Sequence, residues 1–311
     1  MRRFYNLSRG LPSLFSYTST LPRSIAARKP FINVMEVGPR DGLQNESRVL
    51  SVDTKHEFLQ RLDGCGFRRI EAGSLVHPTK VPQMAGTTEL LNRCFDIDAY
   101  LSVLVPTRKH FERLPNNVDE IVLFVAASDT FNQRNIGTDV NGAFKRFEQI
   151  FEAIHTKKWP GKVRASISCV WGCPYEGKVN EMQVCDIIQR FDELGVDSVD
   201  ICDTIGIATP KTTGRLLSHI LGRSMTKMSL HMHDTNGLGV ENCMVGVDMG
   251  IRDLQSSIGG IGGCPFSPKR AGNVDTSALL ARLHAEGFFT GVNEYYVYET
   301  ARWIKTMLAK K

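Results

Sequence analysis

The sequence has little of what defines several protein classes. No window approaches the ~18 uninterrupted apolar residues of a membrane helix, so we expect a soluble protein that does not enter a membrane. Eight cysteines among 311 residues are too dilute for a disulfide scaffold and favour a reducing compartment. With 27 glycines, 13 prolines and 42% hydrophobic residues, the composition also excludes collagen and wholesale disorder. The chain is therefore expected to be an ordinary globular protein.

Acidic side chains are absent from the N-terminal segment. Residues 1–35 hold six basic side chains and no acidic one, and without those six the chain has 32 basic and 33 acidic side chains. The net charge of +5 therefore belongs to this segment, and the rest of the chain offers no basic surface for nucleic acid. The segment is rich in Arg, Ser and Thr, with Leu11, Leu14 and Phe15 able to form one helical face. We predict that residues 1–30 are a mitochondrial transit peptide and that the protein works in the matrix; a disordered extension without targeting function is the alternative.

Eight short strand-like segments recur along the chain, each followed by a helix-like stretch. The strands are predicted at Asn33–Gly38, Arg69–Gly73, Tyr100–Val105, Glu120–Ala126, Arg164–Val170, Ser198–Asp203, Met228–His233 and Asp253–Ile258. Helical periodicity is clearest in Thr54–Cys65, Phe144–Ile154, Met182–Leu194, Pro210–Leu221, Val240–Met249 and Asn293–Ala309. Such alternation predicts parallel strands joined by crossover helices.

The number of repeats selects the fold. Eight strand–helix units over about 255 residues are typical of the α/β class and of a single (β/α)8 TIM barrel. An open, doubly wound sheet is the alternative, but it usually has fewer strands and an early glycine-rich dinucleotide loop, which this sequence lacks. We therefore predict a catalytic barrel over residues 31–290 and a C-terminal helical extension over residues 291–311.

The most informative polar pattern is the pair His231 and His233 on the seventh predicted strand. Side chains two apart on a strand point to the same face, so both imidazoles are expected at the barrel mouth. Asp41, at the end of the first strand, and Asn273 would complete a nitrogen and oxygen ligand set that suits Mg²⁺ or Mn²⁺. A hydrogen-bonded polar strand end without a metal is the alternative.

Three further residues are candidates for chemistry. Arg40 lies beside Asp41 at the end of the first strand, although such a pair is also common on exposed loops. Glu71 is expected to point inward from the second strand, where it would pair with Arg40 and orient it. Cys264 lies in a stretch with five glycines between residues 259 and 272, which predicts a loop with unusual backbone angles or mobility. A thiol on such a loop is a candidate acid/base group.

Several motifs match one family together. They are Val37-Gly38-Pro39-Arg40-Asp41-Gly42-Leu43-Gln44-Asn45-Glu46, Val81-Pro82-Gln83-Met84, Gly172-Cys173-Pro174-Tyr175-Glu176-Gly177-Lys178, Asp203-Thr204-Ile205-Gly206 and Gly262-Gly263-Cys264-Pro265. On these residues, roughly 31 to 297 of the chain resemble the hydroxymethylglutaryl-CoA lyase family. The resemblance implies a carbon–carbon lyase that cleaves 3-hydroxy-3-methylglutaryl-CoA to acetyl-CoA and acetoacetate, a step of leucine breakdown and ketone-body formation.

The resemblance also implies roles for individual residues. The divalent cation would be held by Asp41, His231, His233 and Asn273. Arg40 would stabilise the thioester enolate, Glu71 would support the site, Asp41 or His233 would act as the base, and Cys264 would be the acid/base group of the cysteine loop. The acyl-CoA substrate would contact Arg40, Gln44, Arg164, Ser166, Asp203 and Thr204, and the protein would be a homodimer.

The sequence departs from the family pattern at positions expected near the substrate. Ser166 replaces a Tyr, Asn236-Gly237-Leu238 replaces Tyr-Gly-Gln, and Ser277 replaces a loop Glu. The metal set and Cys264 are retained, so these departures bear on which acyl group is accepted. There are three alternatives: a lyase for a related 3-hydroxy-acyl-CoA such as citramalyl-CoA, a Claisen-type acyltransferase, and a catalytically silent barrel. The cysteine loop and the absence of an added C-terminal regulatory domain favour the lyase over the acyltransferase.

Overall fold

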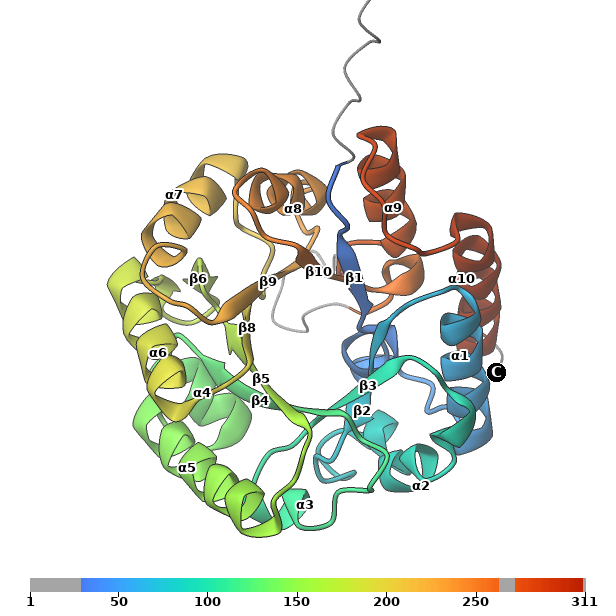
Figure 1. The fold of residues 1–311 in the computed structure, drawn as a ribbon, viewed down its shortest axis with the longest axis horizontal. Helices are drawn as coiled ribbons and strands as arrows, with labels where there is room; N and C mark the ends of the chain where they lie inside the picture. The colour runs from blue at the N-terminus through green and yellow to red at the C-terminus, as the bar shows by residue number, and fades with distance from the viewer. Residues whose placement is uncertain (1–28, 263–271, 310–311) are drawn as a thin grey trace, which may run out of the picture.

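The computed structural model describes residues 29–262 and 272–309, which form a closed barrel of eight parallel strands (Figure 1). The strands follow one another around the barrel in the order β1-β10-β9-β8-β5-β4-β3-β2. Their bounds are β1 (Asn33–Glu36), β2 (Arg69–Ser74), β3 (Tyr100–Leu104), β4 (Glu120–Ala126), β5 (Lys162–Ser168), β8 (Ser198–Asp203), β9 (Lys227–Met232) and β10 (Asp253–Ser256). The predicted single TIM barrel is confirmed.

Each barrel strand begins and ends within two residues of its predicted bounds: β5 begins and ends two residues early, and β1 and β10 keep their predicted starts. β1 and β10 end two residues early, because the chain turns into a five-residue π-helical segment, η1 (Gly38–Gly42), and a 3₁₀ turn, η4 (Ile258–Gly260). At both points a backbone N–H is bonded by the side chain of Glu36. Two elements that sequence patterns did not predict are β6 (Gly172–Cys173) and β7 (Gly177–Lys178), which form a small antiparallel hairpin.

Helices surround the barrel (Figure 1). They are α1 (Val52–Gly64), α2 (Thr87–Leu91), α3 (Arg108–Phe111), α4 (Asp129–Ile136), α5 (Val140–Lys157), α6 (Glu181–Leu194), α7 (Pro210–Ile220), α8 (Gly239–Asp248), α9 (Thr276–Ala285) and α10 (Glu294–Ala309), with 3₁₀ turns η2 (Pro82–Met84) and η3 (Cys94–Asp96). The six helices predicted with bounds are present, and α2, α3, α4 and α9 lie in stretches after strands for which no bounds were predicted. Among the described residues, no helix is long and apolar enough to cross a membrane.

Helix starts follow ordinary capping chemistry. The long helix α5 begins after Asp139, whose side chain accepts a hydrogen bond from the N–H of Gly142 at 2.7 Å. Helix α7 begins with Pro210 after Thr209, which forms a reciprocal capping box with Thr212. The C-terminal helix α10 buries one face through Val297, Ala301 and Ile304 and packs on α1 and α9, so it belongs to the outer layer of the barrel.

The interior of the barrel holds a charged network centred on Arg164 of β5, which is only 1% exposed. Its guanidinium donates to Glu120 at 2.8 Å, to Glu71 and to Ser102 at 3.1 Å each, and to Asp200. Burial by itself would lower the pKa of Arg164, but the surrounding carboxylates raise it well above its usual value. Arg164, which was expected to contact substrate, is held by four protein groups, Glu71 among them, and these bonds do not test a contact with substrate.

Candidate active site

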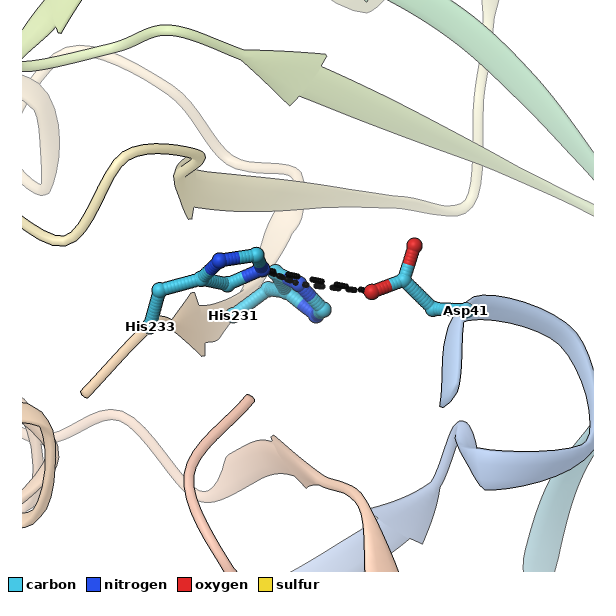
Figure 2. A group of neighbouring side chains, drawn as sticks. All are labelled: Asp41, His231 and His233. Carbon is cyan, nitrogen blue, oxygen red and sulfur yellow. Dashed lines mark hydrogen bonds and ion pairs between the residues drawn. The ribbon is translucent and has the colours of Figure 1, made fainter. Parts of the chain in front are cut away.

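Asp41, His231 and His233 converge at the carboxyl ends of the strands, where TIM barrels place their active sites (Figure 2). Asp41 comes from η1, and the two histidines come from the end of β9 and the residue that follows it. Asp41 Oδ2 lies 3.7 Å from His231 Nε2 and 3.9 Å from His233 Nε2, and the two Nε2 atoms are 3.2 Å apart. One ligand atom from each residue lies within 4.8 Å of the others. The predicted convergence of these three side chains is therefore present.

The unpaired polar atoms around this cluster fit a divalent cation. Asn273 is bridged to His233 through the backbone and lies close enough to influence the pKa values of Asp41 and His233. Its buried Oδ1, like the buried Nδ1 of His233, has no hydrogen-bond partner among the described residues. Buried polar atoms are rarely left unpaired, so an oxygen without a donor beside a carboxylate and two imidazoles matches a site built for a cation.

The charge states of these residues also suit metal binding. Burial would raise the pKa of Asp41, but Arg40 and the two histidines hold it far below its usual range. Burial, with His231 next to it, lowers the pKa of His233 to about 4. At neutral pH the cluster therefore presents an anionic carboxylate and a neutral imidazole, which are the ligand forms that a cation requires.

Arg40 is held between two carboxylates beside this cluster. Its Nε donates to Glu71 Oε1 and its Nη1 donates to Asp41 Oδ1, each at 2.5 Å. Glu71 is fully buried and receives Arg164 on its second oxygen, so it connects the interior network to the mouth. Arg40 is only 8% exposed, and these two bonds hold its positively charged guanidinium next to the candidate metal ligands.

Glu36, a residue that the sequence analysis missed, holds together the segments that carry the site. Its Oε1 accepts from the N–H groups of Gly38 and Ile258 at 2.8 and 2.9 Å, and its Oε2 accepts from Thr276 Oγ1 at 2.8 Å. These bonds join η1, which carries Asp41, to the chain on both sides of Asn273. Burial raises the pKa of Glu36 to about 8. The signal in the sequence was an acid among the apolar residues Val34, Met35 and Val37 of the first predicted strand.

Of the other predicted substrate residues, Ser166 is the one that the strand register places near the candidate metal ligands. Ser166 on β5 is buried, and its Oγ lies 3.3 Å from the Sγ of Cys202 on β8. Cys202 is paired with His231 in the strand register, which places Ser166 near the candidate metal ligands. Gln44 follows η1 and is half-buried.

The other two, Asp203 and Thr204, shape the turn after β8. The carboxylate of Asp203 accepts from the backbone N–H groups of Ile207 at 3.1 Å and Ala208 at 2.8 Å, and burial raises its pKa to about 6. Thr204 Oγ1 accepts from the N–H of Cys169 at 2.8 Å. These contacts give both residues a role in loop structure, and they do not test a contact with substrate.

Of the remaining predicted positions, Asn236 lies on a loop and Ser277 at the start of a helix. Asn236 donates to the carbonyl oxygen of Gly206 at 2.9 Å and so links the loop after β9 to the loop after β8. Ser277 is in the first turn of α9, where its N–H bonds the cap residue Asp275. Cys264, the predicted acid/base thiol, lies outside the described residues.

The fold and the cluster define the class first: a TIM-barrel enzyme with a candidate centre for a divalent cation. Residues 31–304 match the model of the HMGL-like family, and the chain belongs to that family.

Named relatives and solved structures agree with this assignment. The hydroxymethylglutaryl-CoA lyase of Pseudomonas mevalonii is 40% identical over 266 residues, 84% of this chain and 87% of that protein. The mitochondrial hydroxymethylglutaryl-CoA lyase of Homo sapiens is 34% identical over 308 residues, 98% of this chain and 94% of that protein. The crystal structure of an HMG-CoA lyase from Acenitobacter baumannii with coenzyme A and 3-methylmalate has a TM-score of 0.84 at 30% identity, covering 90% of this chain and 92% of that one. The relatives include both mitochondrial and cytoplasmic proteins.

Proposed function

We propose that this chain is a metal-dependent carbon–carbon lyase that cleaves 3-hydroxy-3-methylglutaryl-CoA to acetyl-CoA and acetoacetate. The observation that carries the proposal is the Asp41, His231 and His233 cluster in direct contact with the fixed guanidinium of Arg40. The named relatives at 34–40% identity support the same reaction. When bound by these residues and Asn273, Mg²⁺ or Mn²⁺ would lower the pKa of the substrate's C3 hydroxyl.

Each remaining step falls to a side chain of this protein. Asp41 or His233 takes the proton of the C3 hydroxyl, and the electron pair that remains on oxygen expels the acetyl-CoA enolate as the carbon–carbon bond breaks. Arg40 stabilises the negative charge that develops on the thioester oxygen, since its guanidinium is already oriented by Glu71 and Asp41. Cys264 then supplies a proton to the enolate carbon. Glu71 and Arg164 act as supports, because their contacts are with protein groups.

A related 3-hydroxy-acyl-CoA is a second candidate substrate, favoured by Ser166. Ser166, at an inward position beside the small side chain of Cys202, puts a hydroxyl where a Tyr would put an aromatic ring. Incubation of the metal-loaded protein with hydroxymethylglutaryl-, citramalyl- and longer 3-hydroxy-acyl-CoA thioesters, with acetyl-CoA release as the readout, tests both candidates. Release from none of them would reject a lyase function, and cleavage of citramalyl-CoA in preference to hydroxymethylglutaryl-CoA would support the second candidate.

We also propose that residues 1–30 direct the protein to the mitochondrial matrix and that it works as a homodimer. The support for import is the basic, acid-free composition of this segment, and the support for the dimer is the family resemblance. Deleting residues 1–30 should abolish import into isolated mitochondria and leave a folded, active enzyme. Import that survives the deletion would contradict the transit-peptide assignment, and a monomer in light scattering would contradict the dimer.

A further inference from the structure

The side chain of Gln255, on β10, joins the candidate metal centre to the charged interior of the barrel. Gln255 is 2% exposed, and its Oε1 lies 3.0 Å from Nδ1 of His231. Its Nε2 donates to Ser229 Oγ at 3.2 Å, and Ser229 Oγ in turn donates to Asp200, the carboxylate held by Arg164. A continuous chain of hydrogen bonds therefore runs from Arg164 to a candidate metal ligand, and the proposed chemistry does not use Gln255 or Ser229.

The carboxylate of Asp200 determines the direction of the hydrogen bonds that lead from it to His231. A carboxylate can only accept, so Ser229 must give its single hydroxyl hydrogen to Asp200. The oxygen of Ser229 is then left to accept, and only the amide nitrogen of Gln255 can donate to it. A flipped amide would bring the oxygen of Gln255 against a serine oxygen that has no hydrogen left to offer.

The same logic selects the tautomer of His231. With its nitrogen on Ser229, Gln255 presents its oxygen to His231, and Nδ1 must carry the hydrogen of the neutral ring. The lone pair is then on Nε2, the atom that lies 3.2 Å from His233 and 3.7 Å from Asp41. His233 has no such support, because its Nδ1 is unpaired within the part of the chain that the structure describes.

We propose that Gln255 is a positioning residue of the candidate metal centre, which selects the tautomer and fixes the ring of His231 so that Nε2 is available to the cation. The inference rests on the metal-dependent function proposed above. Outer partners of this kind orient metal-bound histidines and typically change metal affinity 10–100-fold when removed. Because the partner here is an amide, it orients the ring without adding a negative charge next to the centre.

The first test is the affinity of the metal-free full-length chain for Mn²⁺, measured by the electron paramagnetic resonance signal of free Mn²⁺. Gln255→Leu should weaken binding about 10–100-fold, and Ser229→Ala should weaken it less, because the amide is still present but no longer directed. Gln255→Glu should restore binding to the level of the unmodified protein or tighter. Thr213→Val is the matched control: it removes a buried hydrogen bond of 3.1 Å to Asn242, away from the site, and should leave the affinity unchanged.

The second test is the ¹⁵N NMR spectrum of the histidine side chains in the metal-free protein. His231 should be in the Nδ1–H form in the unmodified chain and should lose this preference in Gln255→Leu, with circular dichroism confirming the fold. If Gln255→Leu does not fold, Ser229→Ala provides the same comparison. Unchanged Mn²⁺ affinity with an unchanged His231 tautomer would overturn the proposal. An unmodified protein that binds no Mn²⁺ but shows the Nδ1–H form would instead reject the metal-dependent function and keep the tautomer assignment.

Discussion

Replacement of Arg40 tests the proposed site most directly, because three nitrogens of one guanidinium have separate tasks. Nε holds Glu71 and Nη1 holds Asp41, each at 2.5 Å, and we expect Nη2 to face the thioester oxygen. Arg40→Gln removes the charge and most of these donors. Loss of one fixed donor to a developing oxyanion lowers kcat about 10²–10³-fold, and the lost positive charge should bring the decrease to about 10³-fold or more, about 4 kcal/mol.

Arg40→Lys should be nearly as damaging, with kcat within about tenfold of the Gln variant. The single ammonium of lysine keeps the charge, but it cannot occupy the positions of Nε, Nη1 and a third donor at once. Folding should be affected less than turnover, since Arg164 still neutralises Glu71 in both variants.

The assay is steady-state release of acetyl-CoA at saturating Mg²⁺, together with a thermal melt of each variant. The exposed residue Arg61, which pairs with Glu57 on α1, provides the matched control Arg61→Lys, which should keep normal turnover. Turnover should need the several fixed donors of the guanidinium, and not its charge alone. An Arg40→Lys enzyme whose kcat is within about tenfold of the unmodified value would refute this.

Three further predictions address the pH response, the metal ligands and the acyl pocket. Burial raises the pKa of Glu36 from 4.5 to about 8, so the folded state holds this proton more tightly than the unfolded chain. The associated stability, on the order of a few kcal/mol, is present below pH 4.5 and is lost as the pH rises through 8. In urea titrations of the unmodified protein, the free energy of unfolding should therefore fall between pH 5 and 9, and Glu36→Gln should make this fall smaller. An equal fall in both proteins would contradict the assignment. His233→Ala should lower kcat by several orders of magnitude and weaken Mn²⁺ binding in calorimetry, whereas normal values of both would show that the site is wrongly assigned. Introducing Tyr at Ser166 and Asn236 should shift kcat/KM toward hydroxymethylglutaryl-CoA in competition with bulkier thioesters; unchanged ratios would exclude these positions from specificity.

Local sequence pattern was sufficient for the barrel and for part of the site. Strands of a TIM barrel are covered on both faces, so they appear as short apolar segments such as Glu120–Ala126 that are separated by helical periodicity. The two-residue period of a strand likewise placed His231 and His233 on one face. The turn segment with Asp41 was recognisable because it directly follows the first strand.

Tertiary structure decided the rest, because it depends on which strands become neighbours when the barrel closes. β1 pairs with β10, so Glu36 can reach Ile258 and Thr276, and Gln255 can reach His231 across the β9–β10 pair. Arg164 of β5 likewise has four protein partners inside the barrel, which four other strands contribute. A polar side chain that points into the barrel can bind substrate, a metal ion or another side chain. Which of these it binds depends on neighbours that lie far away in the sequence, so a local sequence pattern cannot predict it.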